Sequence, residues 1–186
     1  MKSVLSRSIK DLQALLPRIE QLAEPLQRLG DALFSCWNKK GKVLIGGNGG
    51  SAADAMHLAE ELCVRFAKNR KALAAIALCD PAVLTCAAND FGFEAIFSRQ
   101  IEALGNAGDV FIALSTSGNS ANLVRAVEAA KSRGLITVSF LGKDGGQLRG
   151  QCDIELLIPS STTARIQECH KILYHTLCEW IESRID

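Results

Sequence analysis

The sequence lacks a long apolar run, a strong charge of either sign and any closely paired cysteines. No apolar run approaches the length of a membrane-spanning helix, so we expect no membrane partner. The 21 basic and 20 acidic residues leave a formal net charge of +1, which gives no electrostatic reason to expect a nucleic-acid partner. The first seven residues lack the apolar core of a signal peptide, and we expect a cytoplasmic protein.

The seven cysteines are scattered and form no Cys-x-x-Cys pair. Most lie within apolar runs, such as Cys63, Cys79 and Cys178. We therefore expect reduced core thiols rather than a disulfide framework or a cysteine-based zinc site. Histidine is also scarce, with three in the chain, so each one is informative.

The 186 residues, 48% of them hydrophobic, suit one domain with a substantial core. We find no internal repeat, no low-complexity segment and no linker. Residues 3–38 have leucines at helical spacing, and Pro17 and Pro25 predict a break into two helices. We expect N-terminal helices in residues 1–40 and an αβα core in residues 41–186 of a single domain.

Apolar strands alternate with helical segments in the rest of the chain. The expected strands cover residues 42–45, 72–79, 110–114, 135–141 and 154–158. The expected helices cover residues 52–66, 82–88, 94–104, 122–132 and 165–183, with a loop at 89–93. Such alternation is typical of a parallel sheet that is covered on both faces. The sequence therefore predicts an α/β fold, a three-layer αβα sandwich with a five-stranded parallel sheet, doubly wound like flavodoxin, with extra N-terminal helices.

A hydroxyl-rich loop follows the strand expected at 110–114. Its sequence is Ser115-Thr116-Ser117-Gly118-Asn119-Ser120, and it leads into a helix. The first turn of a helix has unpaired N–H groups and the positive end of the helix dipole. With hydroxyl donors added, the loop is suited to bind a phosphate group. The alternative for such a loop taken alone is a polar turn with a helix N-cap.

A second loop, Gly46-Gly47-Asn48-Gly49-Gly50-Ser51, follows the first expected strand and opens a helix. Residues 47–52 fit the fingerprint G-x-G-x-x-[GA], and Asp80 stands where a ribose-binding acid belongs, so a dinucleotide-dependent oxidoreductase is a rival interpretation. That interpretation gives the hydroxyl-rich loop no role. Because loops after neighbouring strands of a doubly wound sheet meet at one edge, the two loops together favour a phosphorylated small molecule between them.

His57 and Glu61 are four residues apart on the helix expected at 52–66. This spacing places both side chains on one helix face, within reach of one metal ion or one substrate. A polar pair on the helix surface is the alternative. His170 and His175 lie on the last expected helix. A histidine among apolar neighbours there is either a ligand or, as is more common, a hydrogen-bonded core residue.

Six segments together resemble the sugar isomerase (SIS) domain family and, within it, the bacterial phosphoheptose isomerases. The segments are residues 47–51 (GNGGS), 54–61 (DAMHLAEE), 89–93 (NDFGF), 115–120 (STSGNS), 142–146 (GKDGG) and 164–168 (ARIQE). The resemblance implies an isomerase that converts sedoheptulose 7-phosphate to a manno-heptose 7-phosphate, toward the heptose of lipopolysaccharide. It also implies a cytoplasmic, zinc-dependent homotetramer with one Zn²⁺ ion per subunit.

The resemblance assigns roles to individual residues. Zinc would be bound by His57, Glu61, Gln167 and His175. The phosphate would be held by Ser115, Thr116, Ser117 and Ser120. The sugar would be lined by Asn48, Gly49, Gly50, Ser51, Glu61, Asn89, Asp90 and Gln167. We also expect Arg65 to approach the substrate. Some relatives have an acidic residue where this chain has Ala164, so any role of that acid is absent or replaced here.

Aldose–ketose isomerisation moves a proton between adjacent carbons through an enediol. A carboxylate suits the base and a histidine suits the proton shuttle near neutral pH, so we expect Glu61 to be the base and His175 the acid. A zinc ion would polarise the carbonyl. Because tight binding to zinc lowers the basicity of a carboxylate, we expect the coordination of Glu61 to loosen during the reaction.

Gln167 and His175 are eight residues apart, which on one continuous helix means about 12 Å of rise and roughly 80° of rotation. Both cannot readily reach one metal ion from such a helix. Either Gln167 precedes the regular helix, or the two residues at one site come from different subunits. We expect the second, with active sites at subunit interfaces.

Two alternatives share the same fold. A related branch of the family is an adaptor that binds the replication initiator protein, but the presence of His57, Glu61 and His175 together favours the enzyme. A sugar-phosphate-sensing module usually carries an attached DNA-binding domain, and none fits in this length.

Overall fold

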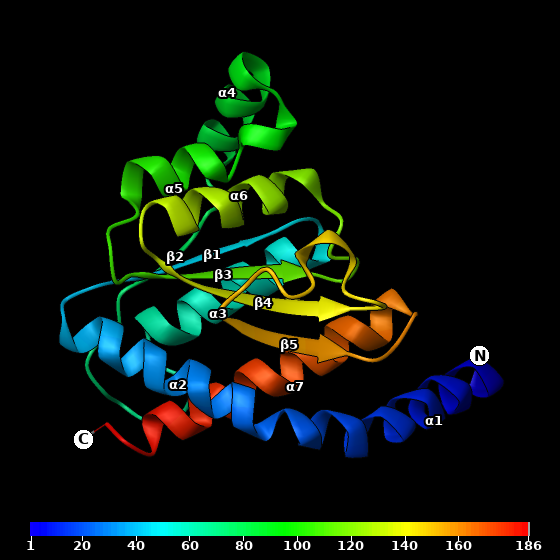
Figure 1. Ribbon diagram of the computed structural model, residues 1–186. Coiled ribbons are helices and arrows are strands. Elements are labelled where there is room, and N and C mark those ends of the chain that lie inside the picture. The colour runs from blue at the N-terminus through cyan, green and yellow to red at the C-terminus, as the bar shows by residue number, and fades with distance from the viewer. Residues whose placement is uncertain (186) are drawn as a thin grey trace.

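Five parallel strands form one sheet in the computed structural model, which describes residues 1–185 (Figure 1). The strands are β1 (Val43–Gly47), β2 (Ala75–Ala77), β3 (Val110–Ser115), β4 (Ile136–Gly142) and β5 (Ile154–Ile158). Their order in the sheet is β2-β1-β3-β4-β5. Every residue of β1 and β3 is buried, because these strands are covered on both faces. The order is that of flavodoxin-like doubly wound folds, and the predicted fold class is confirmed.

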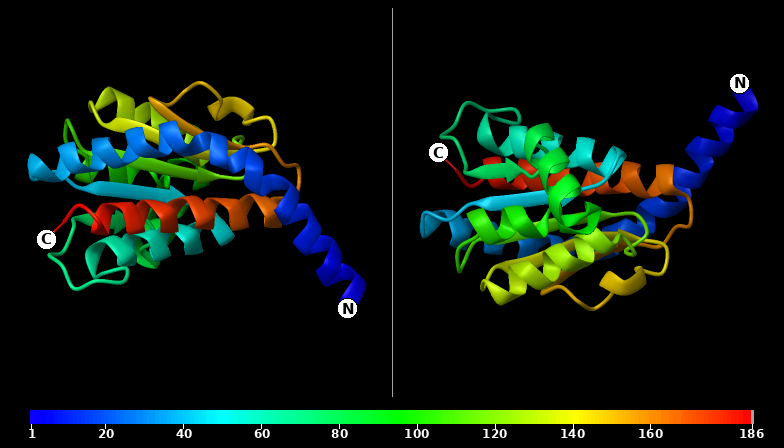
Figure 2. Two further views of the ribbon diagram at one scale, coloured as in Figure 1. Left: turned by 90° about the horizontal axis from the view of Figure 1, so that it is seen from below. Right: turned by 90° about the horizontal axis from the view of Figure 1, so that it is seen from above.

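Helices cover both faces of the sheet and complete the three layers (Figures 1 and 2). They are α1 (Lys2–Ile19), α2 (Ala23–Asn38), α3 (Gly50–Cys63), α4 (Pro81–Phe91), α5 (Ser98–Leu104), α6 (Ala121–Ser132) and α7 (Thr163–Glu182). Short 3-10 turns cover Glu20–Leu22, Phe93–Ala95 and Gly146–Leu148. One face packs against α2, α3 and α7, with Leu29 and Leu58 in its core, and the other packs against α5 and α6. Among residues 1–185, no helix combines the length and hydropathy needed to cross a membrane.

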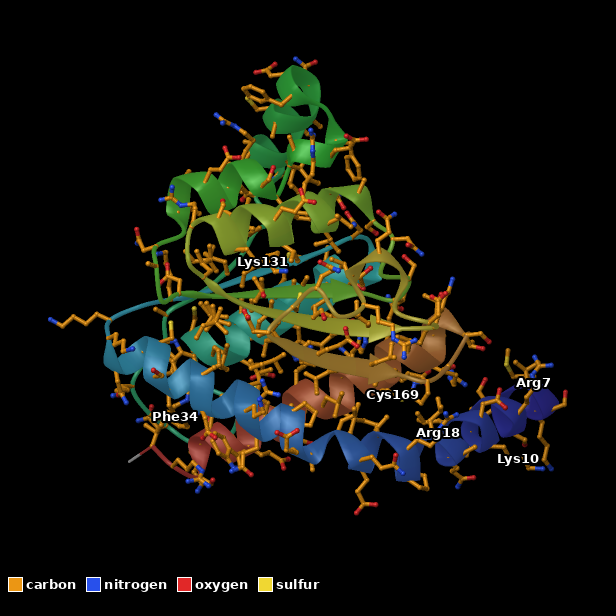
Figure 3. The ribbon with its side chains drawn as sticks, in the orientation of Figure 1. Arg7, Lys10, Arg18, Phe34, Lys131 and Cys169 are labelled. Carbon is orange, nitrogen blue, oxygen red and sulfur yellow. The ribbon has the colours of Figure 1, made fainter. Side chains whose placement is uncertain are left out.

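The N-terminal segment forms two helices, as its prolines predict. The turn at Glu20–Leu22 separates α1 from α2. Pro25 lies in the first turn of α2, where no hydrogen bond is lost, and Pro17 lies in the last turn of α1. The start of α1 projects away from the sheet, and Figure 3 shows Arg7 and Lys10 on this projecting part.

Two boundaries near the glycine-rich loop differ from the prediction. Gly46 and Gly47 belong to β1 rather than to the loop, because they pair with the end of β3. Helix α3 begins at Gly50, two residues earlier than predicted. Gly49, which precedes it, has a φ of +55°, a conformation that glycine adopts without a steric penalty. The loop therefore turns within two residues and brings the start of α3 close to the end of β1.

The loop predicted at 89–93 is wrong for its first three residues. Helix α4 extends to Phe91, so Asn89 and Asp90 lie in its last turn. Asp80 caps the start of this helix, and Gly92, with a φ of +87°, ends it. Local preference places Asn and Asp in loops, but a helix with a strong cap at one end and a glycine at the other extends through them.

Candidate active site

The candidate site lies at the carboxyl ends of β1 and β3, two adjacent strands at the centre of the sheet. Helix α3 follows β1 onto one face and α6 follows β3 onto the other, so the two helices start at one edge and then diverge (Figure 1). Asn48 and Asn122 join the two starts through reciprocal side-chain hydrogen bonds of 3.0 and 2.8 Å. The glycine-rich and hydroxyl-rich loops therefore meet, as a doubly wound order requires.

The hydroxyl-rich loop is shaped by its own side chains. Ser115 Oγ accepts a hydrogen bond from the Gly118 N–H at 3.0 Å, and Ser117 Oγ accepts one from the Asn119 N–H at 3.2 Å. A hydroxyl that accepts an N–H still has its own hydrogen to donate. Ser120 is the N-cap residue of α6, and its side chain makes no capping bond in the described chain. The loop thus offers hydroxyl donors beside a helix N-terminus, an arrangement that suits an anion.

The turn after β4 packs against this loop and holds it in place. Gly118 has a φ of +65°, and a side chain there would collide with the carbonyl of Gly145. The Leu148 N–H donates a hydrogen bond to the Gly118 carbonyl at 3.0 Å. Thr116, between the two serines, is half-buried. Position 118 therefore accepts only glycine, both for its backbone angle and for the close approach.

The glycine-rich loop also leaves no room for a side chain at two of its glycines. A Cβ atom on Gly47 would lie 2.5 Å from the Ser51 carbonyl oxygen, and one on Gly50 would collide with the side chain of Gln167 from α7. The Ser51 N–H donates to the Asn48 carbonyl at 3.0 Å, which starts α3. The residues predicted to line the sugar at positions 48–51 therefore lie together, with Gln167 beside them.

His57, Glu61 and His175 converge about two turns further along α3, where α7 packs against it. Their candidate ligand atoms all lie within 4.8 Å of one another, and His57 Nε2 is 3.0 Å from Glu61 Oε1. Nε2 of His175 is buried and has no hydrogen-bond partner among residues 1–185. Two imidazoles and a carboxylate form a donor set that zinc accepts, with a further position left for substrate. The residues present therefore fit a metal ion.

Three polar side chains beside this cluster are missing from the sequence prediction. Lys171 Nζ is 3.1 Å from Asp54 Oδ1 and 3.3 Å from His57 Nδ1. Tyr174 Oη is 3.2 Å from both Asp54 Oδ1 and His57 Nδ1. Helical spacing could have indicated two of them, because Asp54 precedes His57 by three residues and Lys171 precedes His175 by four. Tyr174 has no such signal, since its contact depends on the packing of α7 against α3.

The surroundings set the charge of the groups in and near the cluster. Burial lowers the pKa of His175 from its ordinary value, and electrostatic repulsion from the side chains of His57 and Lys171 lowers it further. The ring is therefore neutral at pH 7, the form that ligates a metal. Burial raises the pKa of Tyr174 to about 12 despite the nearby Lys171, so its hydroxyl keeps its proton at neutral pH.

A buried ion pair fixes the end of α3 that carries Glu61. Arg70 Nε lies 3.2 Å from Glu182 Oε1, and the Arg70 guanidinium donates to the Glu61 carbonyl at 2.6 Å. The Glu182 carboxylate also accepts three backbone N–H groups from residues 66–68, at 2.8 to 2.9 Å. Burial raises the pKa of the Glu182 carboxyl, but these donors and Arg70 outweigh it and hold the pKa below its ordinary value. The pair therefore ties α7 to α3 next to the candidate ligands.

Helix α7 is continuous from Thr163 to Glu182, so Gln167 and His175 lie on one regular helix. This excludes the possibility that Gln167 precedes the helix. By helix rise the two residues are about 12 Å apart along the axis. Gln167 contacts Gly50 at the start of α3, whereas His175 joins the cluster. Within one chain, Gln167 is therefore separate from the other three predicted ligands.

Other predicted contacts lie away from the cluster in this chain. Asn89 and Asp90 are exposed on α4, which projects beyond α5 and α6 (Figure 1), and the Asn89 amide donates to Asp90 Oδ1 at 2.7 Å. Arg65 is exposed beyond the end of α3 rather than one turn along it. Ala164 is exposed in the first turn of α7. None of these residues completes the site within a single chain.

Asp80 argues against the dinucleotide interpretation. Its Oδ1 accepts hydrogen bonds from the Ala82 N–H at 2.8 Å and the Val83 N–H at 3.0 Å. A ribose-binding acid in a dinucleotide fold pairs with sugar hydroxyls instead. The carboxylate of Asp80 is engaged as a helix cap, and the fingerprint is left without its acidic partner.

Comparison with known proteins agrees with this geometry. The family model described as SIS domain matches residues 9–142. A phosphoheptose isomerase from Fusobacterium nucleatum is 51% identical over 163 residues, which cover 88% of this chain and 84% of that protein. One from Trichlorobacter lovleyi is 47% identical over 184 residues, covering 98% and 94%. The solved phosphoheptose isomerase from Neisseria gonorrhoeae superposes with a TM-score of 0.92 at 40% identity, covering 98% of each chain. The chain therefore belongs to the SIS-domain family, among its phosphoheptose isomerases.

Proposed function

We propose that this chain converts D-sedoheptulose 7-phosphate to D-glycero-D-manno-heptose 7-phosphate through an enediol, in the cytoplasmic synthesis of lipopolysaccharide heptose. The observation that carries the proposal is the cluster of His57, Glu61 and His175, whose ligand atoms lie within 4.8 Å of one another. The names of the relatives supply the reaction class. The residues supply the chemistry, since isomerisation needs a base, an acid and charge stabilisation at one place.

Substrate binding is assigned to the two loops at the edge of the sheet. The hydroxyls of Ser115, Thr116, Ser117 and Ser120 would donate to the phosphate, helped by the N-terminus of α6. The segment 48–51 and the side chain of Gln167 would line the sugar, because they lie together at the start of α3. The phosphate would thus be held at β3 while the carbonyl end extends along α3.

In the chemical step, Glu61 would take the proton from the carbon next to the carbonyl and return it to the former carbonyl carbon, while His175 would protonate the carbonyl oxygen with the proton taken from the neighbouring hydroxyl. The neutral His175 ring would first accept the proton of the sugar hydroxyl and then donate it as an imidazolium, so the ring is neutral again at the end of the reaction. The chemistry that a bound zinc ion would supply here is stabilisation of negative charge on the sugar oxygens. His57, Glu61 and His175 would hold that ion, one per subunit.

The site as proposed is shared between subunits of a homotetramer. Gln167 cannot join the cluster of its own chain, so we assign it to the metal site of a neighbouring copy. Asn89 and Asp90 are exposed on the projecting helix α4, from which they could line the sugar in another copy. An adaptor function is disfavoured, because such a protein has no need of a histidine–carboxylate cluster.

The reaction is tested directly with sedoheptulose 7-phosphate by following formation of the aldose. Glu61→Gln and His175→Gln should each abolish turnover, because they remove the base and the acid but keep the side-chain volume. Glu102→Gln is the matched control, since Glu102 is an exposed carboxylate on α5 that pairs with Arg99, and it should retain turnover. Unchanged turnover in Glu61→Gln and His175→Gln would refute the catalytic assignment.

The metal and the assembly are tested separately. Metal analysis of the purified protein should find zinc at one per subunit, and His57→Ala should lose it. Gel filtration should give a tetramer that carries all the activity. A fully active monomer would refute the shared site, and a metal-free active enzyme would refute the zinc assignment.

A further inference from the structure

The two ring nitrogens of His57 face different partners. Nε2 faces the cluster, 3.0 Å from Glu61 Oε1. Nδ1 faces away from it, 3.2 Å from Tyr174 Oη and 3.3 Å from Lys171 Nζ. An imidazole that ligates a metal through one nitrogen carries its proton on the other, and that proton needs an acceptor. The hydrogen-bond partner of Nδ1 therefore decides whether Nε2 is unprotonated and able to ligate a metal ion.

The two partners of Nδ1 are chemically opposite. An ammonium can only donate, so Lys171 can pair only with an unprotonated Nδ1. The neutral His57 ring then carries its proton on Nε2, directed at Glu61, and cannot bind a metal there. A phenol can accept as well as donate, so Tyr174 can take the Nδ1 proton. Its own hydrogen then goes to Asp54 Oδ1, which lies 3.2 Å away.

We propose that Tyr174 is a positioning residue, which accepts the Nδ1 proton of His57 and passes its own hydrogen bond to Asp54, so that Nε2 is free for a divalent metal. Lys171 stabilises the opposite tautomer and weakens metal binding. The inference rests on the proposed metal site and adds the residues that prepare one of its ligands.

The packing of Tyr174 supports this role. Its side chain is fully buried, and its ring lies edge-on to those of both His57 and His175, with centroids 5.6 and 4.8 Å away. A buried hydroxyl requires hydrogen-bond partners, and Asp54 Oδ1 and His57 Nδ1 each lie 3.2 Å from it, with Lys171 as a third neighbour. Asp54 is itself buried and held by Lys171 at 3.1 Å. The hydroxyl therefore lies beside Nδ1, where the Lys171 ammonium is the competing hydrogen-bond donor.

The test compares zinc affinities of the metal-depleted full-length protein by competition with a chromophoric chelator. Tyr174→Phe removes only the hydroxyl, and we expect zinc to bind about 10–100-fold more weakly, the usual effect of losing such a partner. Lys171→Met keeps the aliphatic stem and removes the charge, and we expect tighter binding than in the wild type. Opposite changes from two neighbouring side chains would not arise from a general loss of structure.

The tautomer of His57 gives a second readout from imidazole ¹⁵N chemical shifts. In zinc-loaded wild type, Nδ1 should carry the proton, and a protonated Nε2 would overturn the proposal even if Tyr174→Phe fails to fold. Equal zinc affinity of Tyr174→Phe and wild type would overturn the role of Tyr174 while leaving the metal site intact. No zinc binding by the wild type, or unchanged binding by His57→Ala, would overturn the metal site and this inference with it.

Discussion

His170 should make the protein sensitive to mild acid. Its ring is buried, with Nε2 3.0 Å from the Leu141 carbonyl and Nδ1 without a hydrogen-bond partner among residues 1–185. Burial lowers the pKa of His170 to about 4, although the Leu141 carbonyl and the charge of Asp54 partly oppose it. The folded protein therefore keeps this histidine neutral at a pH where the unfolded chain protonates it.

The sign and size of the effect follow from two pKa values of His170, about 4 in the folded protein and 6.5 in the unfolded chain. Well above pH 6.5 the ring is neutral in both states, and the full stability is present. As the pH falls from 6.5 toward 4, the unfolded chain takes up a proton that the folded protein does not, so the free energy of unfolding falls. With 1.36 kcal/mol for each pKa unit, His170 should account for a loss of about 2 kcal/mol at pH 5.

Urea denaturation at pH 7.5 and pH 5.0 measures this loss in the metal-depleted protein. His170→Gln is the test variant, because an amide can still donate to the Leu141 carbonyl but does not titrate in this range. The other two histidines are unchanged in the variant, so their contributions cancel in the comparison. We expect the variant to lose about 2 kcal/mol less than wild type between the two pH values. Equal losses would refute the assignment of a buried neutral ring at position 170.

Three further predictions concern the ion pair, the hydroxyl-rich loop and the metal. Glu182→Gln leaves the Arg70 guanidinium buried without its carboxylate, so urea denaturation should show a loss of about 3–5 kcal/mol, partly restored by adding Arg70→Met. Gly118→Ala forces a side chain into a positive-φ position against the turn after β4, so KM for the ketose phosphate should rise about tenfold. Gly150→Ala is its control, since φ there is also positive but the surroundings are open, and an equal rise in KM would contradict the loop assignment. Zinc at 100 times its Kd should raise the free energy of unfolding by about 2.7 kcal/mol, and the same gain in His57→Ala would contradict the ligand assignment.

Much of the fold and part of the candidate site could be predicted from local pattern. Fully apolar strands between helical segments indicate a parallel sheet, because each such strand must be covered on both faces. His57 and Glu61 could be paired from their spacing alone, since side chains four residues apart lie on one helix face. The hydroxyls at 115–120 could be placed at a helix start, because an apolar strand precedes them and a helical pattern follows.

Local preference failed where neighbouring structure overrode it. Asn89 and Asp90 favour a loop by composition, yet the helix that begins at the Asp80 cap continues through them and ends only at Gly92. Gly46 and Gly47 suggest a loop, yet the pairing of β1 with β3 continues through both. The helix cap at Asp80 and the strand β3 both lie outside the segments whose patterns were read.

The sequence by itself determined the helix periodicity, the buried strands and the pair His57 and Glu61, since these depend on backbone geometry within a few residues. Only the tertiary structure decided that α7 brings His175 to that pair, and that Tyr174 meets both His57 and Asp54. The same helix carries Gln167 away from the cluster. These contacts are between residues more than a hundred positions apart in the sequence. They depend on the order of the strands and on the packing of α3 against α7, which no local pattern specifies.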